Sequence, residues 1–140
     1  MIYKEDTICA IATAMIDAGI GIIRVSGEKS IDIVSRLYID AKGNYSLTDY
    51  QSHTINYGFI VDDNKNKVDE VMVSIMKGPR SYTREDVVEI NTHGGRIVMS
   101  ILSSLNVNLV MLLTSYYSKG VTSALPSPSV VSLKNPAQFT

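Results

Sequence analysis

Thr54-Ile-Asn-Tyr-Gly-Phe-Ile-Val61 and Glu70-Val-Met-Val-Ser-Ile-Met76 are two stretches of alternating apolar and polar residues, joined by the polar run Asp62-Asp-Asn-Lys-Asn-Lys67. Such alternation is typical of strands that bury one face, and a short polar connection between two of them predicts a β-hairpin. The spacing Asp62-x-Asn64-x-Asn66 also resembles the start of a calcium-binding loop. However, Lys67 stands where that loop needs a glycine and Val73 where it needs an acidic ligand, so we expect a solvated turn.

Further short apolar runs on either side of this hairpin predict more strands, over Ile8–Ala12, Gly21–Val25 and Asp86–Asn91. Helical spacing of apolar residues predicts a short helix over Ile31–Leu37, with Ser30 as its N-cap, and a second over Ile97–Leu105. Strands in hairpin order mixed with a few helices predict an α+β fold with a mixed, largely antiparallel sheet, and not a doubly wound parallel one.

The composition is that of one compact domain, with 140 residues, 45% of them hydrophobic and 19% charged. The formal net charge of -1 removes a simple electrostatic argument for a nucleic-acid footprint. Cys9 is the lone cysteine, so neither an intramolecular disulfide nor a cysteine-rich zinc site is expected. His53 and His93 stand in no recognised metal-ligand pattern, and we expect no metal.

No segment of the sequence predicts membrane insertion or secretion. Acidic residues precede the first apolar run, unlike in a secretory signal, and we expect a cytoplasmic protein. Residues 97–117 carry no charge, but an Asn106-Val-Asn108 interruption favours a turn between two buried elements over a membrane span. The stretch Ser123–Val130 has two prolines and three serines, which is typical of an extended connector.

Two nucleotide-binding motifs can be excluded. After Gly19-Ile-Gly21 the third glycine of a dinucleotide fingerprint would fall on Arg24, which rules out that motif. No P-loop sequence occurs in the chain, so we expect no hydrolysis of GTP or ATP by this chain alone.

The segment Gly78–Gly95 holds the most informative polar residues. Glu89 lies inside an apolar strand pattern, with Val87 and Asn91 on its side and Val88 and Ile90 on the other. A carboxylate at such a position is unfavourable unless it is paired or faces a cavity. The residues alone therefore leave two interpretations open. Glu89 either faces water or forms a salt bridge with Arg24 or Arg80, or it belongs to a binding site.

Four ordered blocks make the sequence resemble a known family. They are Asp6-Thr-Ile-Cys-Ala-Ile-Ala-Thr13, Gly19-Ile-Gly-Ile-Ile-Arg-Val-Ser-Gly27, Val68-Asp-Glu-Val-Met-Val-Ser74 and the run from Pro79 to Gly95. Together they are similar to the N-terminal domain of the MnmE (TrmE) tRNA-modification GTPases. That resemblance implies a fold like the folate-binding domain of aminomethyltransferases, and a homodimer that binds a tetrahydrofolate derivative near its interface. It also implies a role in modifying C5 of the wobble uridine of tRNA, with an MnmG-like flavoprotein as partner.

The resemblance assigns cofactor binding to Arg24 and Glu89 and implies no catalytic residue on this chain. The implied ligand is 5-formyltetrahydrofolate or another tetrahydrofolate derivative. A pterin presents a ring N–H beside an exocyclic amino group, and the Glu89 carboxylate can accept both, while Arg24 would bind a carbonyl or carboxylate oxygen of the ligand. GTP, K+ and Mg2+ are implied only for a G domain, which this chain lacks.

The chain departs from the family pattern at two places. Family members usually read Pro-Pro-Gly-Arg-Gly-Gly where this chain has Ala14-Met-Ile-Asp-Ala-Gly19, and the resemblance fades after Leu105. We expect residues 1–105 to form the folate-binding and dimerisation domain, and 106–140 to be a divergent tail that completes or extends it. The alternatives are a structural dimerisation domain or truncated product that binds no ligand, and an aminomethyltransferase-type one-carbon enzyme.

Overall fold

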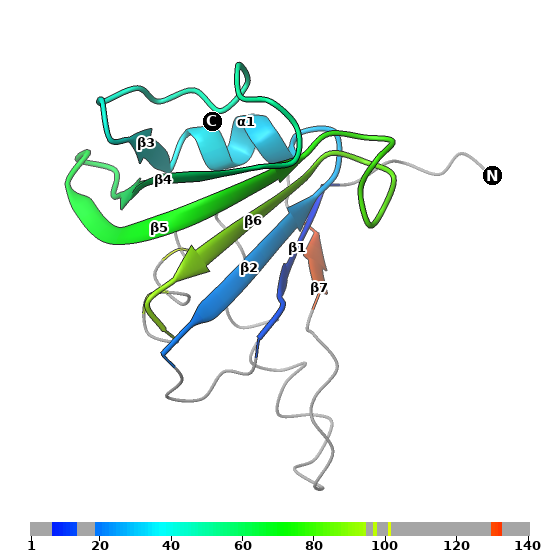
Figure 1. Cartoon of the computed structure of the whole chain (residues 1–140). Coiled ribbons are helices and arrows are strands. Elements are labelled where there is room, and N and C mark those ends of the chain that lie inside the picture. Colours follow the sequence, from blue (N-terminus) through cyan, green and yellow to red (C-terminus); the bar gives the residue numbers. More distant parts are fainter. Residues whose placement is uncertain (1–6, 14–18, 95–96, 98–100, 102–129, 133–140) are drawn as a thin grey trace, which may run out of the picture.

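The computed structural model describes residues 7–13, 19–94, 97, 101 and 130–132. They include one sheet and the short helix α1 (Figure 1). The sheet has seven strands in the order β3-β4-β5-β6-β2-β1-β7. Each neighbouring pair is antiparallel. The predicted α+β class with a largely antiparallel sheet is therefore confirmed for the described part of the chain. The strands are β1 (Ile8–Ile11), β2 (Gly21–Ser26), β3 (Tyr38–Asp40), β4 (Thr54–Val61), β5 (Lys67–Met76), β6 (Val87–Thr92) and β7 (Val130–Ser132).

The hairpin predicted from the alternating stretches is β4–β5. Tyr57 lies opposite Met72 in its register. Its turn is held by Asp62, whose Oδ1 accepts the backbone N–H groups of Asn64 at 2.9 Å and Asn66 at 2.8 Å. The Asp62 carboxylate is thus engaged by its own loop, as expected for a turn. Strand β5 begins at Lys67, earlier than the alternation alone predicted.

The helix α1 runs over Ser30–Ser35, and the predicted N-cap is wrong. Lys29 holds the N-cap position and makes no side-chain cap bond. The hydroxyl of Ser30 donates instead to the carbonyl of Asp86, at 2.9 Å. Ser30 is fully buried against the start of β6, so its hydroxyl bonds a neighbouring segment and not its own helix.

Two strands were not predicted, β3 and β7, and each has only three residues. Three residues are too few to establish an alternating pattern. Strand β7 begins at Val130, where the sequence predicted the end of a connector, and pairs with β1. Only Ile97 and Ile101 of the second predicted helix are described, and both are helical. The predicted turn at Asn106–Asn108 lies outside the described residues.

The two faces of the sheet differ in burial. One face carries the core, with Val25, Val73 and Ile90 fully buried, and α1 packs against it through Ile31 and Val34 (Figure 1). The other face, which we call the open face, carries Arg24, Ser74 and Glu89 in one row of the register. The exposed apolar side chains of Ile55, Tyr57 and Met72 occupy the alternate positions of β4 and β5 that belong to this face.

The described residues include neither a membrane-spanning helix nor a cluster of metal-ligating side chains. No helix there is long and apolar enough to cross a membrane. No group of three or more His, Cys, Asp or Glu side chains within that part of the chain is arranged to hold a metal ion.

Candidate functional site

Arg24 and Glu89 lie opposite one another on the open face, on the paired strands β2 and β6. The Arg24 Nε donates to Glu89 Oε1 at 2.7 Å, and Nη2 contacts the same oxygen. The Glu89 side chain is 16% exposed and that of Arg24 38% exposed. The structure thus brings the two predicted site residues into contact. Their ion pair is one of the arrangements that the sequence left open for Glu89.

A loop between β5 and β6 borders this ion pair. The guanidinium carbon of Arg24 lies 4.9 Å from the centre of the Tyr82 ring, which is itself 75% exposed. The loop is fastened to β2 by the hydroxyl of Ser26, which bonds the Thr83 hydroxyl at 2.7 Å and donates to Glu85 at 3.2 Å. An arginine held between a carboxylate and an aromatic face has both its charge and its flat surface engaged. Arg24 therefore has two partners in this structure, the Glu89 carboxylate and the Tyr82 ring.

A pocket of about 490 Å³ lies beside the ion pair on the open face. Its central row runs across β2, β6 and β5 and consists of the paired residues Ile22, Asn91 and Met72. On β2 and β6 this row lies two residues away from Arg24 and Glu89. Arg24 and Glu89 themselves do not line it. The lining residues are Gly19, Ile20, Ile22, Tyr57, Glu70, Val71, Met72, Asn91, Thr92 and His93. Pockets of this size and largely apolar character commonly hold small molecules.

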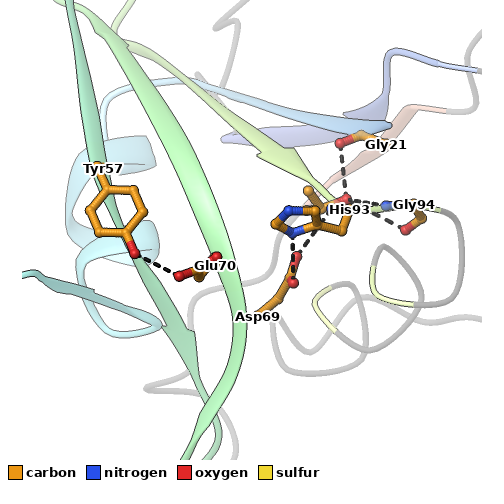
Figure 2. Close-up of polar contacts among 7 residues, drawn as sticks. Gly21, Tyr57, Asp69, Glu70, His93 and Gly94 are labelled. Atoms are coloured by element: carbon orange, nitrogen blue, oxygen red, sulfur yellow. Dashed lines mark hydrogen bonds and ion pairs between the residues drawn. The ribbon is translucent and has the colours of Figure 1, made fainter. Parts of the chain in front are cut away.

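Two polar pairs lie at this pocket, each with a carboxylate (Figure 2). The Tyr57 hydroxyl donates to Glu70 at 2.7 Å, and this hydrogen bond raises the pKa of Tyr57. One carboxylate oxygen of Asp69 accepts the backbone N–H of His93 at 3.1 Å, and the other lies 3.0 Å from the Nδ1 of His93. A ring nitrogen that faces a carboxylate can donate to it, so the Asp69 carboxylate orients this exposed imidazole.

Asn91 Oδ1 is a buried polar atom that lacks a hydrogen-bond partner. It is the only such side-chain atom in the described part of the chain. Unpaired buried polar atoms are rare, since desolvating them is unfavourable. Strand alternation had placed Asn91 on the same side as Glu89, but it gave no sign of a pocket there, because the pocket also needs β4 and β5.

Comparison with known proteins identifies the family. Residues 7–126 match the family described as "GTP-binding protein TrmE N-terminus". The chain belongs to this TrmE N-terminal family. The matched range includes Arg24, Glu89 and all of the residues that line the pocket.

Three relatives, each named tRNA modification GTPase MnmE, illustrate the similarity. The protein of Alkaliphilus oremlandii is 55% identical over 96 residues, which are 68% of this chain and 21% of the relative. That of Alkaliphilus metalliredigens is 52% identical over 96 residues, with the same coverage of 68% and 21%. That of Staphylococcus aureus strain JH9 is 46% identical over 113 residues, or 80% of this chain and 22% of the relative. The matched part is thus about a fifth of the relatives' length.

Proposed function

We propose that this chain is a tetrahydrofolate-binding and homodimerisation module of an MnmE-like GTPase that modifies C5 of the wobble uridine in tRNA. In this proposal its sheet belongs to the fold of aminomethyltransferase folate-binding domains. Residues 1–105 carry the module and 106–140 complete or extend it. The GTP, K+ and Mg2+ sites belong to a G domain, and an MnmG-like flavoprotein and tRNA are the partners of the whole protein.

The observation that carries the ligand proposal is the shared position of Arg24 and Glu89. The side chains lie on one face of the sheet, 2.7 Å apart, although 65 residues separate them in the chain. The Glu89 side chain is mostly buried but keeps some exposure, which a ligand contact requires. Both of its contacts with Arg24 use Oε1. Oε2 is therefore available to another donor.

These two residues match the chemistry of a reduced folate. Glu89 can accept the ring N–H and the exocyclic amino group of a pterin, because a carboxylate presents two acceptor oxygens side by side. Arg24 would then turn part of its five-donor fork toward a carbonyl or carboxylate oxygen of the ligand. The protein supplies binding and orientation, while the one-carbon chemistry belongs to the cofactor when it is bound.

Calorimetry with 5-formyltetrahydrofolate tests this proposal. Glu89→Ala should weaken binding by about 2 kcal/mol, or some thirtyfold, since a charge-assisted contact with the ligand is lost. Glu28→Ala is the matched control, because Glu28 is exposed and lies outside the site. The proposal is wrong if the wild-type chain gives no heat with the ligand, or if Glu89→Ala binds as tightly as Glu28→Ala.

One observation favours a second candidate function, a dimerisation domain without a ligand. Arg24 already forms an ion pair with Glu89, and the Tyr82 ring already covers part of the Arg24 guanidinium. A residue pair with these contacts is stable without a cofactor. Sedimentation velocity separates the candidates. A dimer that forms equally well with and without 5-formyltetrahydrofolate, together with an absence of binding heat, favours the structural function.

A further inference from the structure

The loop that joins β5 to β6 (Figure 1), residues 77–86, exposes positive charge beside an aromatic ring. Arg80 and Arg84 are both exposed, and Tyr82, between them in the sequence, is 75% exposed. Neither arginine forms a salt bridge with a carboxylate of the described residues. We call these three side chains the loop surface. Within the described part of the chain, its two guanidinium groups are thus open to an external anion.

The acidic residues of the same loop are engaged in holding it. Asp86 Oδ1 accepts the backbone N–H of Gly78 at 2.9 Å, and the Glu85 carboxylate accepts the hydroxyl of Ser26 at 3.2 Å. Both acids are half-buried, whereas the arginines are exposed. Local potential depends on where charges lie and not only on their sum. The loop therefore presents positive charge to solvent although the formal net charge of the chain is -1.

The loop is fastened to β2 at more than one point. The Gly27 N–H donates to the carbonyl of Asp86 at 2.9 Å, and the Ser26 hydroxyl bonds the Thr83 hydroxyl at 2.7 Å. Arg84 has a φ of 67°, which is unfavourable for a residue with a Cβ. Such a conformation persists where the surroundings enforce it, and it is frequent at binding surfaces. A loop held in this way loses little conformational entropy on binding.

We propose that Arg80, Tyr82 and Arg84 form a contact surface for single-stranded RNA, in which the arginines bind phosphates and the tyrosine ring stacks on an unpaired base. The guanidinium fork matches the oxygens of a phosphate. Cations interleaved with an exposed aromatic ring are the combination that binds single strands. An acidic peptide would use the arginines but leave the ring without a role.

This inference deepens the proposed function and rests on it for the presence of RNA, since tRNA is the partner in that proposal. The guanidinium carbon of Arg24 lies 4.9 Å from the centre of the Tyr82 ring, so the loop surface adjoins the Arg24–Glu89 pair. RNA held there would lie close to the residues to which cofactor binding is assigned. The loop surface is the part of this domain that we expect to meet the RNA.

The test is fluorescence anisotropy of a labelled oligouridylate, about ten nucleotides long, titrated with the 140-residue chain. We expect a dissociation constant on the order of 100 µM at about 50 mM salt. Two phosphate contacts predict that the affinity falls about sevenfold between about 50 and about 200 mM salt, because each contact releases counterions.

The arginines are tested by a charge-matched pair of double variants. Arg80→Gln with Arg84→Gln should weaken binding about tenfold or more, since both phosphate contacts are lost. Arg36→Gln with Lys42→Gln removes the same charge from two exposed side chains on either side of β3. This control should change binding by no more than about twofold.

The stacking contact has its own matched control. Tyr82→Ala should weaken binding about fivefold or more, and Tyr82→Phe should retain it, because the ring and not the hydroxyl makes the contact. Tyr45→Ala is the control, since Tyr45 is 44% exposed and has Lys65 Nζ 5.1 Å from its ring centre. It removes a similar ring beside a cation elsewhere on the surface and should leave binding unchanged.

Thermal unfolding separates binding from stability. Glycine adopts a φ of 67° readily, so Arg84→Gly should keep or raise Tm while it weakens RNA binding about threefold or more. A variant that loses affinity without losing stability cannot be explained by a damaged fold. If Arg84→Gly binds RNA as tightly as the wild type, Arg84 is not a phosphate contact and the proposal is overturned.

The remaining outcomes also decide the proposal. It is overturned if the wild-type chain binds no RNA up to its solubility limit, if the Arg36 and Lys42 control weakens binding as much as the loop variant, or if Tyr82→Ala has no effect. Poly-L-glutamate serves as a competitor. If it displaces the RNA at equal charge concentration, the surface suits an acidic protein segment and the RNA proposal is wrong.

These titrations contain no folate, so the two proposals can fail separately. A chain that binds 5-formyltetrahydrofolate but no RNA contradicts only the loop surface. A chain that binds RNA through Arg80 and Arg84 but gives no heat with the folate contradicts only the cofactor proposal.

Discussion

The ring of Tyr38 on β3 occupies the space that a side chain at Gly58 on β4 would need. A Cβ at position 58 would overlap the Tyr38 ring and the Ile39 carbonyl oxygen. The Tyr38 hydroxyl donates to the carbonyl of Tyr57 at 2.9 Å, so the fully buried ring is fixed across its neighbour strand. Glycine is required here for close approach of two strands and not for an unusual backbone angle.

Gly58→Ala should destabilise the protein, because the added methyl group meets a fixed ring and a backbone atom. Overpacking of this kind typically lowers the free energy of unfolding by about 1–3 kcal/mol. Urea denaturation monitored by circular dichroism measures the change. Gly19→Ala is the control, since a Cβ at Gly19 would meet no atom within 4 Å and should change stability by less than about 0.5 kcal/mol. Equal stability of the two variants would contradict the packing described.

The stability of the protein should depend on pH through Asp40. Hydrogen bonds from the backbone and side chain of Asn44 lower the pKa of Asp40 from 3.8 to about 2. A carboxyl whose pKa is lower in the folded state stabilises that state above its unfolded pKa and loses this effect as pH falls through its folded pKa. Asp40→Asn should therefore lower Tm at neutral pH.

The difference in Tm between wild type and Asp40→Asn should shrink as the pH falls from about 4 to about 2, since protonation then removes the same charge from the wild type. Thermal melts across this range test the trend. Asp49→Asn, a change at an exposed aspartate nearby in the chain, should change Tm at neutral pH much less than Asp40→Asn does. A constant difference for Asp40→Asn between neutral and acidic pH would show that its charge plays no part.

Cys9 should resist thiol reagents in the folded protein. It is 1% exposed in the core, and burial raises the pKa of its thiol to about 12. Because the thiolate is the reactive form, labelling with iodoacetamide at pH 8 should be at least about a hundredfold slower than in the denatured chain. Mass spectrometry of timed samples measures both rates. Similar rates would mean that β1 opens readily from the sheet.

Ser30→Ala should lower the free energy of unfolding by about 1 kcal/mol, since it removes a buried hydrogen bond to the Asp86 carbonyl. The carbonyl keeps its second donor, the backbone N–H of Gly27 at 2.9 Å, which limits the loss. Ser46→Ala provides the control, because the Ser46 hydroxyl bonds only an exposed loop amide, at 3.2 Å. If Ser30→Ala lowers the free energy of unfolding by no more than Ser46→Ala does, the Ser30 hydroxyl does not have this role.

The strands predicted from the sequence are those with an alternating pattern or a short apolar run. The β4 stretch was predicted with its observed ends, because its buried and exposed residues alternate and a polar turn follows. The three-residue strands β3 and β7 are held by their neighbours and carry no periodic signal of their own. The N-cap at Ser30 was wrong for a similar reason, since its partner, Asp86, is distant in the sequence.

The candidate site was only partly visible in the sequence. Alternation placed Glu89 on the side of the strand opposite Val88 and Ile90, and the structure agrees. Its pairing with Arg24 depends on the register between β2 and β6, which no local pattern fixes. The pocket at Asn91 draws residues from four strands or their ends. Such a cavity arises from the arrangement of the strands and has no motif.

The pairing of β2 with β6 also bears on how the chain folds. Strands β1 and β2 are consecutive in the sequence and pair with each other, and the same holds for each step from β3 to β6. Strand β2, in contrast, pairs with β6, so residues as distant in sequence as Arg24 and Glu89 come together. Closing so long a loop is slow relative to forming a hairpin. We therefore expect the Arg24–Glu89 ion pair to form later in folding than the hairpins on either side of it. A chain whose hairpins had formed without the β2–β6 pairing would keep most of the strand pairs described here but would lack the Arg24–Glu89 contact.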